Sequence, residues 1–366
     1  MAQKNLSACI LTSPPIVRCL KKSVHYSLIT HMLMKHSQFT FLLLIVLFNI
    51  YPSMQAQNFQ KPNSPLAHTY SIVAFAPEAG QMGVAVQSHW FSVGSIVSWG
   101  EAGVGVVATQ SFVNPDFGPD GLAMMKQGIN PQKALDSLIK SDEGRKFRQV
   151  ALLNAKGETA AYTGSDCIAE AHHLQGKHYS VQANMMLTDK VCPAMANAFE
   201  TTKGTLAERM VAAIEAAENA GGDIRGRQSA ALLVVSGQPT GKPWRGRGGD
   251  LRLEDHAQPV QELKRLLQVH TAYQHMNAGD LHIEKGNIDA ALVDYSAAQQ
   301  LFPDNEEMSY WTAVSMANAG RTEEAMQLFR KVFAKNPNYQ ILTSRIVKNK
   351  LLVVSNEVLM QILEIK

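Results

Sequence analysis

The stretch that decides the fold is TYSIVAFAPEAGQMGVAVQSHWFSVGS, residues 69–95. It contains two apolar runs rich in strand-forming residues, Ile72–Ala76 and Met82–Val86. Between them, Pro77–Gly80 supplies the residue types that turns require. This order predicts a β-hairpin, and the apolar character of both runs places it in the core of a sheet.

Polar side chains lie at one end of this predicted hairpin. Thr69 and Ser71 open the first strand, and Gln87, Ser88 and His89 end the second. A hydroxyl group at the start of a strand suggests a nucleophile held at the edge of a sheet. Core strands also begin with such residues, so the pattern alone leaves a catalytic and a purely structural interpretation open.

Strand and helix patterns continue in blocks as far as residue 256. Because they do not alternate one by one, they predict an α+β fold with segregated layers. Buried strands such as ALLVV, residues 231–235, need cover on both faces, which two facing sheets with helices outside would provide. We therefore expect a four-layer αββα sandwich. The expected strands are 69–76, 82–89, 95–99, 102–109, 149–154, 159–163, 178–186 and 226–236, and the expected helices are 122–127, 131–140, 191–201 and 205–220.

From about residue 257 the chain becomes helical and repeats itself with a period of 34 residues. The spacing resembles that of tetratricopeptide repeats and predicts two copies, 272–305 and 306–339, in an all-α domain, 257–366. Flanking helices, 260–270 and 341–366, would have to cap them. Such repeats favour binding of a protein partner, although a structural or dimerising appendage, and so a homo-oligomer, is an open alternative. The matched positions are Gly286 and Gly320, Ala291 and Ala325, Tyr295 and Phe329, Ala298 and Val332, and Pro303 and Pro337.

The beginning of the chain has the pattern of a secretory signal peptide. Phe39–Ile50 is an apolar run that follows a basic flank, and Ala56 provides a small residue for cleavage. We expect residues 1–56 to be removed and the protein to be exported, periplasmic or secreted. An uncleaved anchor is the alternative, although the run is short for a membrane span. Met34 would be a better start for this segment, so residues 1–33 are consistent with a misassigned start. Residues 57–68 then read as a polar linker.

Composition excludes several classes of function. The charged fraction is 18% and the formal net charge is +3, so neither nucleic acid nor an anionic membrane surface is an expected partner. The expected mature chain keeps two of the four cysteines, Cys167 and Cys192, and both a disulfide and two free thiols are open. No phosphate-binding loop, dinucleotide fingerprint or metal-ligand spacing is present, so we expect no cofactor.

Seven segments in chain order resemble one family, the domain of unknown function numbered 1028, which is classed with the N-terminal-nucleophile (Ntn) hydrolases. The similarity covers residues 69–267 and implies an Ntn-hydrolase-like αββα sandwich. It also implies that the first residue of the first strand is the nucleophile, exposed by self-cleavage or by removal of upstream residues. Thr69 matches best and Ser71 is the alternative. The segments are HTYSIVAF, GVAVQSHWFSVGS, GEAGVGVVATQSF, YTGSDC, YSVQANMM, GGDIRGRQSAALLVV and DLRLEDH.

These observations favour an exported hydrolase of amide bonds in a small amide or a peptide, with the sandwich over 69–256. A free amine on Thr69 would act as its base, which requires the His68–Thr69 bond to be cut. A non-enzymatic binding module whose repeats dock a partner is the first alternative. A metal-dependent hydrolase built on His89, Asp255 and His256 is the second. The candidate catalytic residues are Thr69, Ser71, Asn184 and Ser229, and the candidate substrate-binding residues are Gln87, Ser88, His89, Gln110, Arg227 and Asp250.

Overall fold

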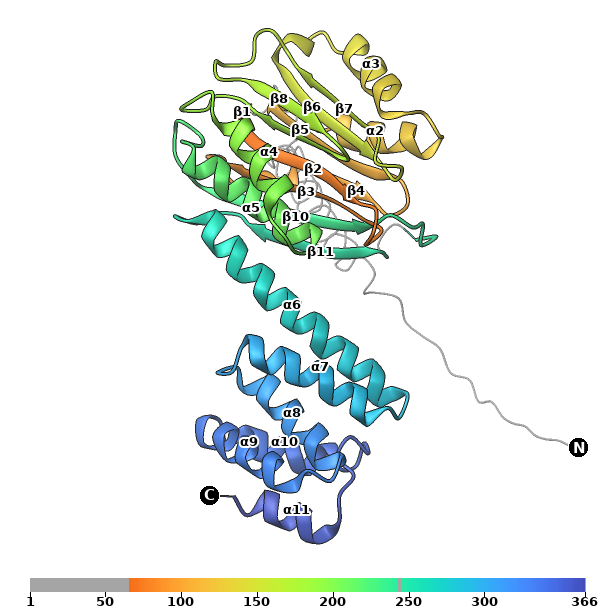
Figure 1. Cartoon of the computed structure of the whole chain (residues 1–366), viewed down its shortest axis with the longest axis vertical. Coiled ribbons are helices and arrows are strands. Elements are labelled where there is room, and N and C mark those ends of the chain that lie inside the picture. Colours follow the sequence, from red (N-terminus) through yellow and green to blue (C-terminus); the bar gives the residue numbers. More distant parts are fainter. Residues whose placement is uncertain (1–65, 243–244, 366) are drawn as a thin grey trace, which may run out of the picture. The chain divides into compact units, whose positions relative to one another are not determined.

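The structure, a computed structural model, describes residues 66–242 and 245–365. The predicted signal peptide and most of the predicted linker lie outside these residues. Within them, no helix is both long enough and apolar enough to cross a membrane. The described chain contains an α/β domain followed by a helical region (Figure 1).

One antiparallel sheet of the α/β domain has six strands, with the predicted hairpin at its centre. In the hairpin Val73 lies opposite Val84 and Thr69 lies opposite Ser88, which sets the register. The prediction of a hairpin here is confirmed. The strand order is β11 (Arg247–Leu253), β10 (Ser229–Ser236), β3 (Gln81–Ser88), β2 (Thr69–Ala76), β9 (Tyr179–Ala183) and β8 (His172–Gly176).

The second sheet has five strands and is also antiparallel. Its strand β5 pairs with β6 along one edge, so β1 and β4 share the other edge. The order is β1 (Leu66–Ala67), β5 (Gly105–Phe112), β6 (Arg148–Asn154) and β7 (Thr159–Thr163), with β4 (Ser98–Glu101) also on β5. Two short 3-10 turns, η1 (Val93–Ser95) and η2 (Arg145–Phe147), precede β4 and β6.

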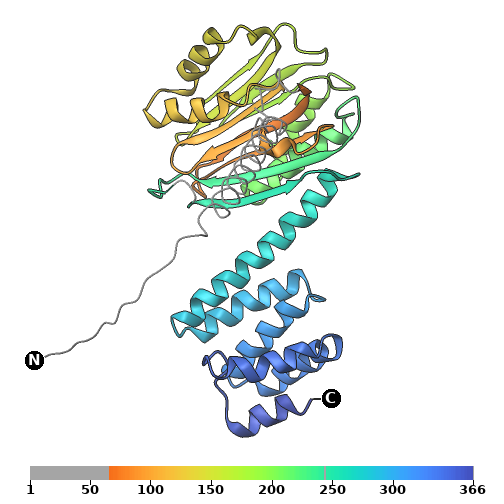
Figure 2. The same cartoon turned by 180° about the vertical axis from the view of Figure 1, so that it is seen from behind.

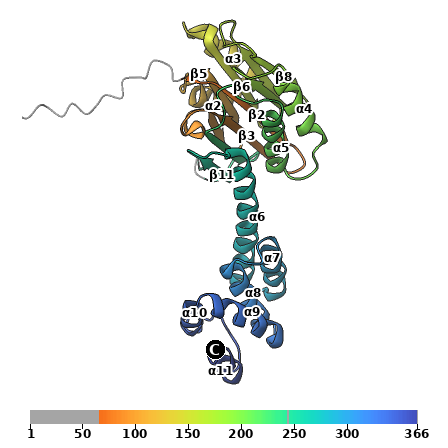
Figure 3. The ribbon, with the colours of Figure 1, turned by 90° about the vertical axis from the view of Figure 1, so that its left-hand side faces the viewer.

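Helices cover the outer faces of the two sheets, so the predicted four-layer αββα sandwich is confirmed (Figure 3). The apolar side chains of α2 (Phe117–Lys126) and α3 (Pro131–Ser141) form one core with β5, β6 and β7. Those of α4 (Val191–Thr201) and α5 (Leu206–Asn219) form another with β2, β9 and β10. A third core lies between the sheets.

The alternation of β2 shows how the sequence serves two of these cores at once. Tyr70, Ile72 and Ala74 pack in the core of α4 and α5, whereas Val73 packs between the sheets. Successive side chains of a strand point to opposite faces, so Thr69 and Ser71 share the face of Val73. The hydroxyl groups that open the hairpin are therefore directed between the two sheets.

The helical region has the expected repeat. Its matched positions are buried, as Ala291, Tyr295, Ala325 and Phe329 show, so they form the core as the 34-residue period predicts. The predicted break before residue 272 is absent, because α6 runs unbroken from β11 into the repeats (Figure 2). The helices are α6 (Pro259–Glu284), α7 (Ile288–Leu301), α8 (Glu306–Asn318), α9 (Thr322–Lys335), α10 (Asn338–Ile346) and α11 (Asn356–Leu363).

The end of the predicted linker departs from expectation. Residues 66–68 are part of the fold, since β1 pairs with β5 and places Ala67 opposite Ser111. Ala67 and His68 are 0% and 1% exposed. The prediction that the whole of 57–68 is linker is therefore wrong for its last three residues. Two paired residues are too few to produce a recognisable strand pattern.

Candidate active site at the polar end of the sandwich

Three hydroxyl groups form a row across the six-stranded sheet. Thr69 on β2 lies opposite Ser88 on β3, and Ser88 lies opposite Ser229 on β10. All three are 0% exposed. By strand alternation they face the second sheet, as their neighbours in the inter-sheet core do. We call this set the hydroxyl row. The predicted residues Thr69, Ser88 and Ser229 are thus brought together by strand pairing.

Beside the hydroxyl row, four buried carboxamides bond to one another and to Ser71. The Ser71 hydroxyl donates to Gln110 Oε1 at 2.6 Å and accepts from Gln182 Nε2 at 2.6 Å. Gln149 Oε1 accepts from Gln110 Nε2 at 2.7 Å and from Asn184 Nδ2 at 2.9 Å. We call these five residues the amide network. Because both hydrogen-bonding directions of Ser71 are used by buried amides, it is held as part of the scaffold.

The peptide bond before Thr69 has unusual partners. The carbonyl oxygen of His68 accepts a hydrogen bond from Ser88 Oγ at 2.6 Å and another from Arg225 Nη2 at 2.9 Å. Asp223 holds the guanidinium in place through Arg225 Nε at 3.0 Å and Nη2 at 2.7 Å. Two donors, one of them charged, therefore polarise this carbonyl group.

Thr69 itself is anchored on both sides. Its hydroxyl donates to the carbonyl oxygen of Ala67 at 2.6 Å. Its own carbonyl accepts from the backbone N–H of Asn184 at 3.1 Å and from Gln110 Nε2 at 3.2 Å. The contacts to Asn184 and Gln110 lie downstream of the His68–Thr69 bond, so they do not depend on the upstream residues.

The side chain of His68 fills a space of its own. Its Nδ1 lies 2.7 Å from Asn184 Oδ1, and its ring meets the edge of Phe112 with the centroids 5.5 Å apart. Asn184 Nδ2 donates to other carbonyls, so Oδ1 is the acceptor and the tautomer that satisfies the contact carries its proton on Nδ1. Burial lowers the pKa of the His68 imidazole. The ring is therefore neutral at pH 7.

Two predicted site residues have other surroundings. The Ser229 hydroxyl donates to the carbonyl oxygen of Trp90 and accepts from the N–H of Val93 at 3.1 Å, which fixes the segment that follows β3. Gln87 alternates with Ser88 and faces the core of α4 and α5. Its buried carboxamide has no hydrogen-bond partner among the described residues.

Three further predicted residues lie at the surface. His89 is exposed, and its backbone N–H donates to Asp223. Arg227 is ion-paired with Glu218 at 2.6 Å. Asp250 bonds to two arginines of its own edge strand, at 2.6 and 2.8 Å. The structure therefore does not bring Arg227 or Asp250 into the hydroxyl row or the amide network.

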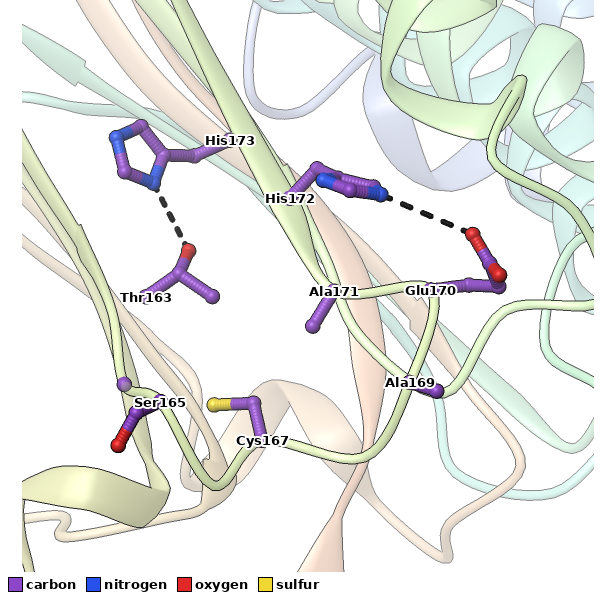
Figure 4. A pocket seen from close by; sticks show the side chains of 9 residues that line it. Thr163, Ser165, Cys167, Ala169, Glu170, Ala171, His172 and His173 are labelled. Carbon is purple, nitrogen blue, oxygen red and sulfur yellow. Dashed lines mark hydrogen bonds and ion pairs between the residues drawn. The ribbon is translucent and has the colours of Figure 1, made fainter.

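A cavity of about 530 Å³ lies between the ends of β7 and β8 (Figure 4). Thr163 connects it to the amide network, because its hydroxyl accepts from Gln149 Nε2 at 2.9 Å and lies 2.8 Å from His173 Nδ1. Burial raises the pKa of the Cys167 thiol in the same cavity. The lining residues are Thr163, Gly164, Ser165, Cys167, Ala169, Glu170, Ala171, His172 and His173.

Both described cysteines are free thiols. Cys167 donates to the carbonyl of Arg148 and Cys192 to that of His172, each at 3.4 Å. Within residues 66–242 and 245–365, no group of three or more histidine, cysteine or acidic side chains is placed to hold a metal ion. His256 Nδ1 instead accepts from the backbone N–H of Gln258 at 3.0 Å.

Several residues of this site are not among those predicted from the sequence. His68 lies at the end of the predicted linker, and Arg225 lies two residues before the predicted Arg227. The sequence does carry a signal for Arg225, because an Asp-x-Arg sequence precedes β10 within a segment that shows the family resemblance. Gln149 begins one predicted strand and Gln182 lies within another, but only the facing of the two sheets joins them.

Comparison with known proteins relates both regions of the chain to described families. A family model described as a family of unknown function, DUF1028, matches residues 69–263, which is more than half of the chain. A tetratricopeptide repeat model matches residues 282–346. The crystal structure of protein SPO2555 from Silicibacter pomeroyi, a DUF1028 protein, is 31% identical with a TM-score of 0.51. The match covers 56% of this chain and 90% of that one. No curated protein matched the chain.

Proposed function

Because the chain belongs to the DUF1028 family of unknown function, we propose a function from its own geometry: hydrolysis of amide bonds by Thr69. In this proposal the His68–Thr69 bond is first cut, so that Thr69 becomes the N-terminal residue. The observation that supports it best is the carbonyl group of His68. Ser88 and Arg225 both donate to its oxygen, and the next residue in the chain, Thr69, carries a hydroxyl group.

The cut is an acyl shift followed by hydrolysis. Thr69 Oγ1 attacks the carbonyl carbon of His68, and Ser88 and Arg225 stabilise the charge that develops on the oxygen. The C–N bond breaks as the proton of the hydroxyl passes to the Thr69 nitrogen, which leaves an ester. The acyl shift thereby frees the Thr69 amine. Water then hydrolyses the ester, which releases the His68 carboxylate and restores the Thr69 hydroxyl.

The same groups would then act on a substrate. An α-amine titrates near pH 8, so a useful fraction of the Thr69 amine is unprotonated at neutral pH and accepts the hydroxyl proton. The substrate carbonyl takes the place of the His68 carbonyl between Ser88 and Arg225. Water releases the acyl group in the second half of the reaction.

Two substitutions test which hydroxyl is the nucleophile. Thr69→Ala should abolish both the cut and the amide hydrolysis by the purified protein. Ser71→Ala should retain both, because Ser71 is held by Gln110 and Gln182. Loss of activity in Ser71→Ala with activity retained in Thr69→Ala would reverse the assignment.

The other regions complete the proposal. Tetratricopeptide-type repeats build surfaces that bind other proteins, so the helical region would bring the enzyme to a protein partner.

Export through the predicted signal peptide would place the protein in the periplasm or outside the cell. Fractionation of cells that express the full chain, with immunoblotting of each fraction, tests export. Recovery of the protein only in the cytoplasmic fraction would contradict export.

A further inference from the structure

The residues before Thr69 are bound in the way a substrate is bound. Leu66 and Ala67 form β1, which pairs antiparallel with β5. On this edge of β5, β4 pairs only as far as Ala108, and β1 pairs with the residues beyond it. An extended segment added to a sheet edge is a common mode of peptide recognition. When these residues leave, the backbone of β5 at Ser111 and Phe112 loses its partner on this edge, while β6 stays paired on the other edge.

The His68 side chain occupies a second built feature. Asn184 Oδ1 accepts from its ring, Phe112 packs edge-on against it, and the residue is 1% exposed. A buried acceptor left without a donor is costly, so this space discriminates by hydrogen bonding as well as by shape. Ala67, which precedes His68, is 0% exposed, so its position accepts only a small side chain. Leu66 is 44% exposed, so its position accepts side chains of different sizes.

From these contacts we infer that residues 66–68 mark the acyl side of the substrate-binding site, and that the substrates are peptides bound as an added strand on β5. The residue before the cleaved bond is histidine, or another planar residue that donates a hydrogen bond, and a small residue precedes it. The site is vacated only if the His68–Thr69 bond is cut, so this assignment rests on the proposed function.

A binding measurement tests the site without requiring hydrolysis. Within residues 66–242 and 245–365, Ala67 is the one buried apolar residue of the three α/β cores that precedes Thr69, so a chain that begins at Thr69 keeps the rest of these described cores. Such a chain, released from a fusion, is titrated calorimetrically with the peptides Leu-Ala-His, Leu-Ala-Leu and Leu-Leu-His, each with a free carboxylate. Leu-Ala-His should bind at least tenfold more tightly than either of the others.

Two variants make the test specific. Asn184→Leu should reduce the preference for histidine over leucine to less than threefold, whereas Asn197→Leu, on the exposed face of α4, should leave it unchanged. Equal affinity for the three peptides, or a preference that survives in Asn184→Leu, would overturn the inference. If the protein binds Leu-Ala-His selectively but hydrolyses no histidyl amide, the proposed function alone is refuted. If it hydrolyses amides but shows no preference for Leu-Ala-His, this inference alone is refuted.

A measurement on the full chain guards against a variant that fails to fold. In a full chain that also carries Thr69→Ala, so that the upstream residues stay in place, His68→Leu leaves Asn184 Oδ1 without its donor, whereas His68→Asn retains one. We expect His68→Leu to lower the melting temperature by about 2–6 °C more than His68→Asn does. A leucine that is tolerated as well as asparagine would show that the space does not discriminate, which contradicts the inference.

Discussion

At the scale of single residues, the hydroxyl row contains groups with different roles. Ser88 donates to the carbonyl of His68, whereas Ser229 donates to that of Trp90. Both are buried serines in paired positions of adjacent strands, so they form a matched pair for mutagenesis.

Ser88→Ala should slow the cut between His68 and Thr69 by about 100-fold, since removal of one oxyanion donor typically costs a factor of this order. Ser229→Ala should leave the rate of the cut unchanged but reduce the free energy of unfolding by about 1–2 kcal/mol, because the buried groups of Trp90 and Val93 lose their partner. Mass spectrometry at timed intervals after refolding measures the rate. Equal slowing in both variants would contradict the role assigned to Ser88.

Ser71→Ala tests the structural role of the amide network. The substitution leaves Gln110 Oε1 without a donor and Gln182 Nε2 without an acceptor, both buried. We expect the free energy of unfolding in urea to fall by about 2–3 kcal/mol. A stability equal to that of the unmodified chain would show that these amides find other partners.

His68 makes the stability of the uncut chain depend on pH. Burial lowers the pKa of the folded imidazole below 6.5, the value of the unfolded chain. Between these two values the unfolded chain binds a proton that the folded chain does not, so the free energy of unfolding falls as the pH falls through 6.5. The Thr69→Ala chain, which stays uncut, should melt at a lower temperature at pH 5 than at pH 7.5. His68→Asn in the same background should narrow this difference, and an unchanged difference would contradict the assignment.

At the scale of elements, α6 belongs to two regions of the chain. Its first turns carry Val260, Leu263 and Leu267 into the core of α4, α5 and the six-stranded sheet. Farther along, Ala272 and Met276 pack in the first core of the repeats. His270 Nε2 lies 2.6 Å from the carbonyl oxygen of Gly248 and ties the middle of the helix to β11. The α/β core therefore extends beyond residue 256, where the sequence pattern predicts its end.

Leu263→Ala should destabilise the α/β domain by about 2–4 kcal/mol, because Leu263 is fully buried and its removal leaves a cavity. Leu281→Ala, at a position of the same helix that is 54% exposed, should change the free energy of unfolding by less than about 0.5 kcal/mol. Urea unfolding followed by circular dichroism measures both. Similar effects in the two variants would show that α6 is not part of the domain core.

The elements also show what a single sequence can reveal. Strongly apolar strands such as β2, β3 and β10, and helices with clear caps such as α5, could be predicted because their patterns are local. A capping box formed by Thr205 and Glu208 begins α5. Strand β8 could not be predicted from the sequence, because His172–Gly176 has few strand-forming residues. Its pairing with β9 is what makes it a strand.

The same limit applies to the candidate site. Thr69, Ser88 and Ser229 could be listed as polar residues at strand ends, but their adjacency follows from the pairing of β2, β3 and β10. The amide network requires the second sheet, because Gln110 and Gln149 come from β5 and β6. Arg225 and His68 lie outside regular strands, so no periodicity identifies them.

At the scale of the whole molecule, one chain contains two different parts. The first is a sandwich in which residues 66–68, upstream of Thr69, cover the hydroxyl row. The second is a repeat region of a kind that binds proteins. Ala67, His68 and Thr69 are all buried, so the proposed function requires residues 66–68 to leave before Thr69 meets a substrate. We therefore propose that the His68–Thr69 bond is cut in the functional protein.

Intact-mass measurement of the purified protein, with N-terminal sequencing of the same sample, tests this claim most directly. The full chain and its Thr69→Ala variant are expressed from the same start and purified identically. We expect the unmodified protein to begin at Thr69 with a free amine and the variant to retain His68 joined to residue 69. An unmodified protein in which His68 is still joined to Thr69, as it is to residue 69 in the variant, would contradict the proposal.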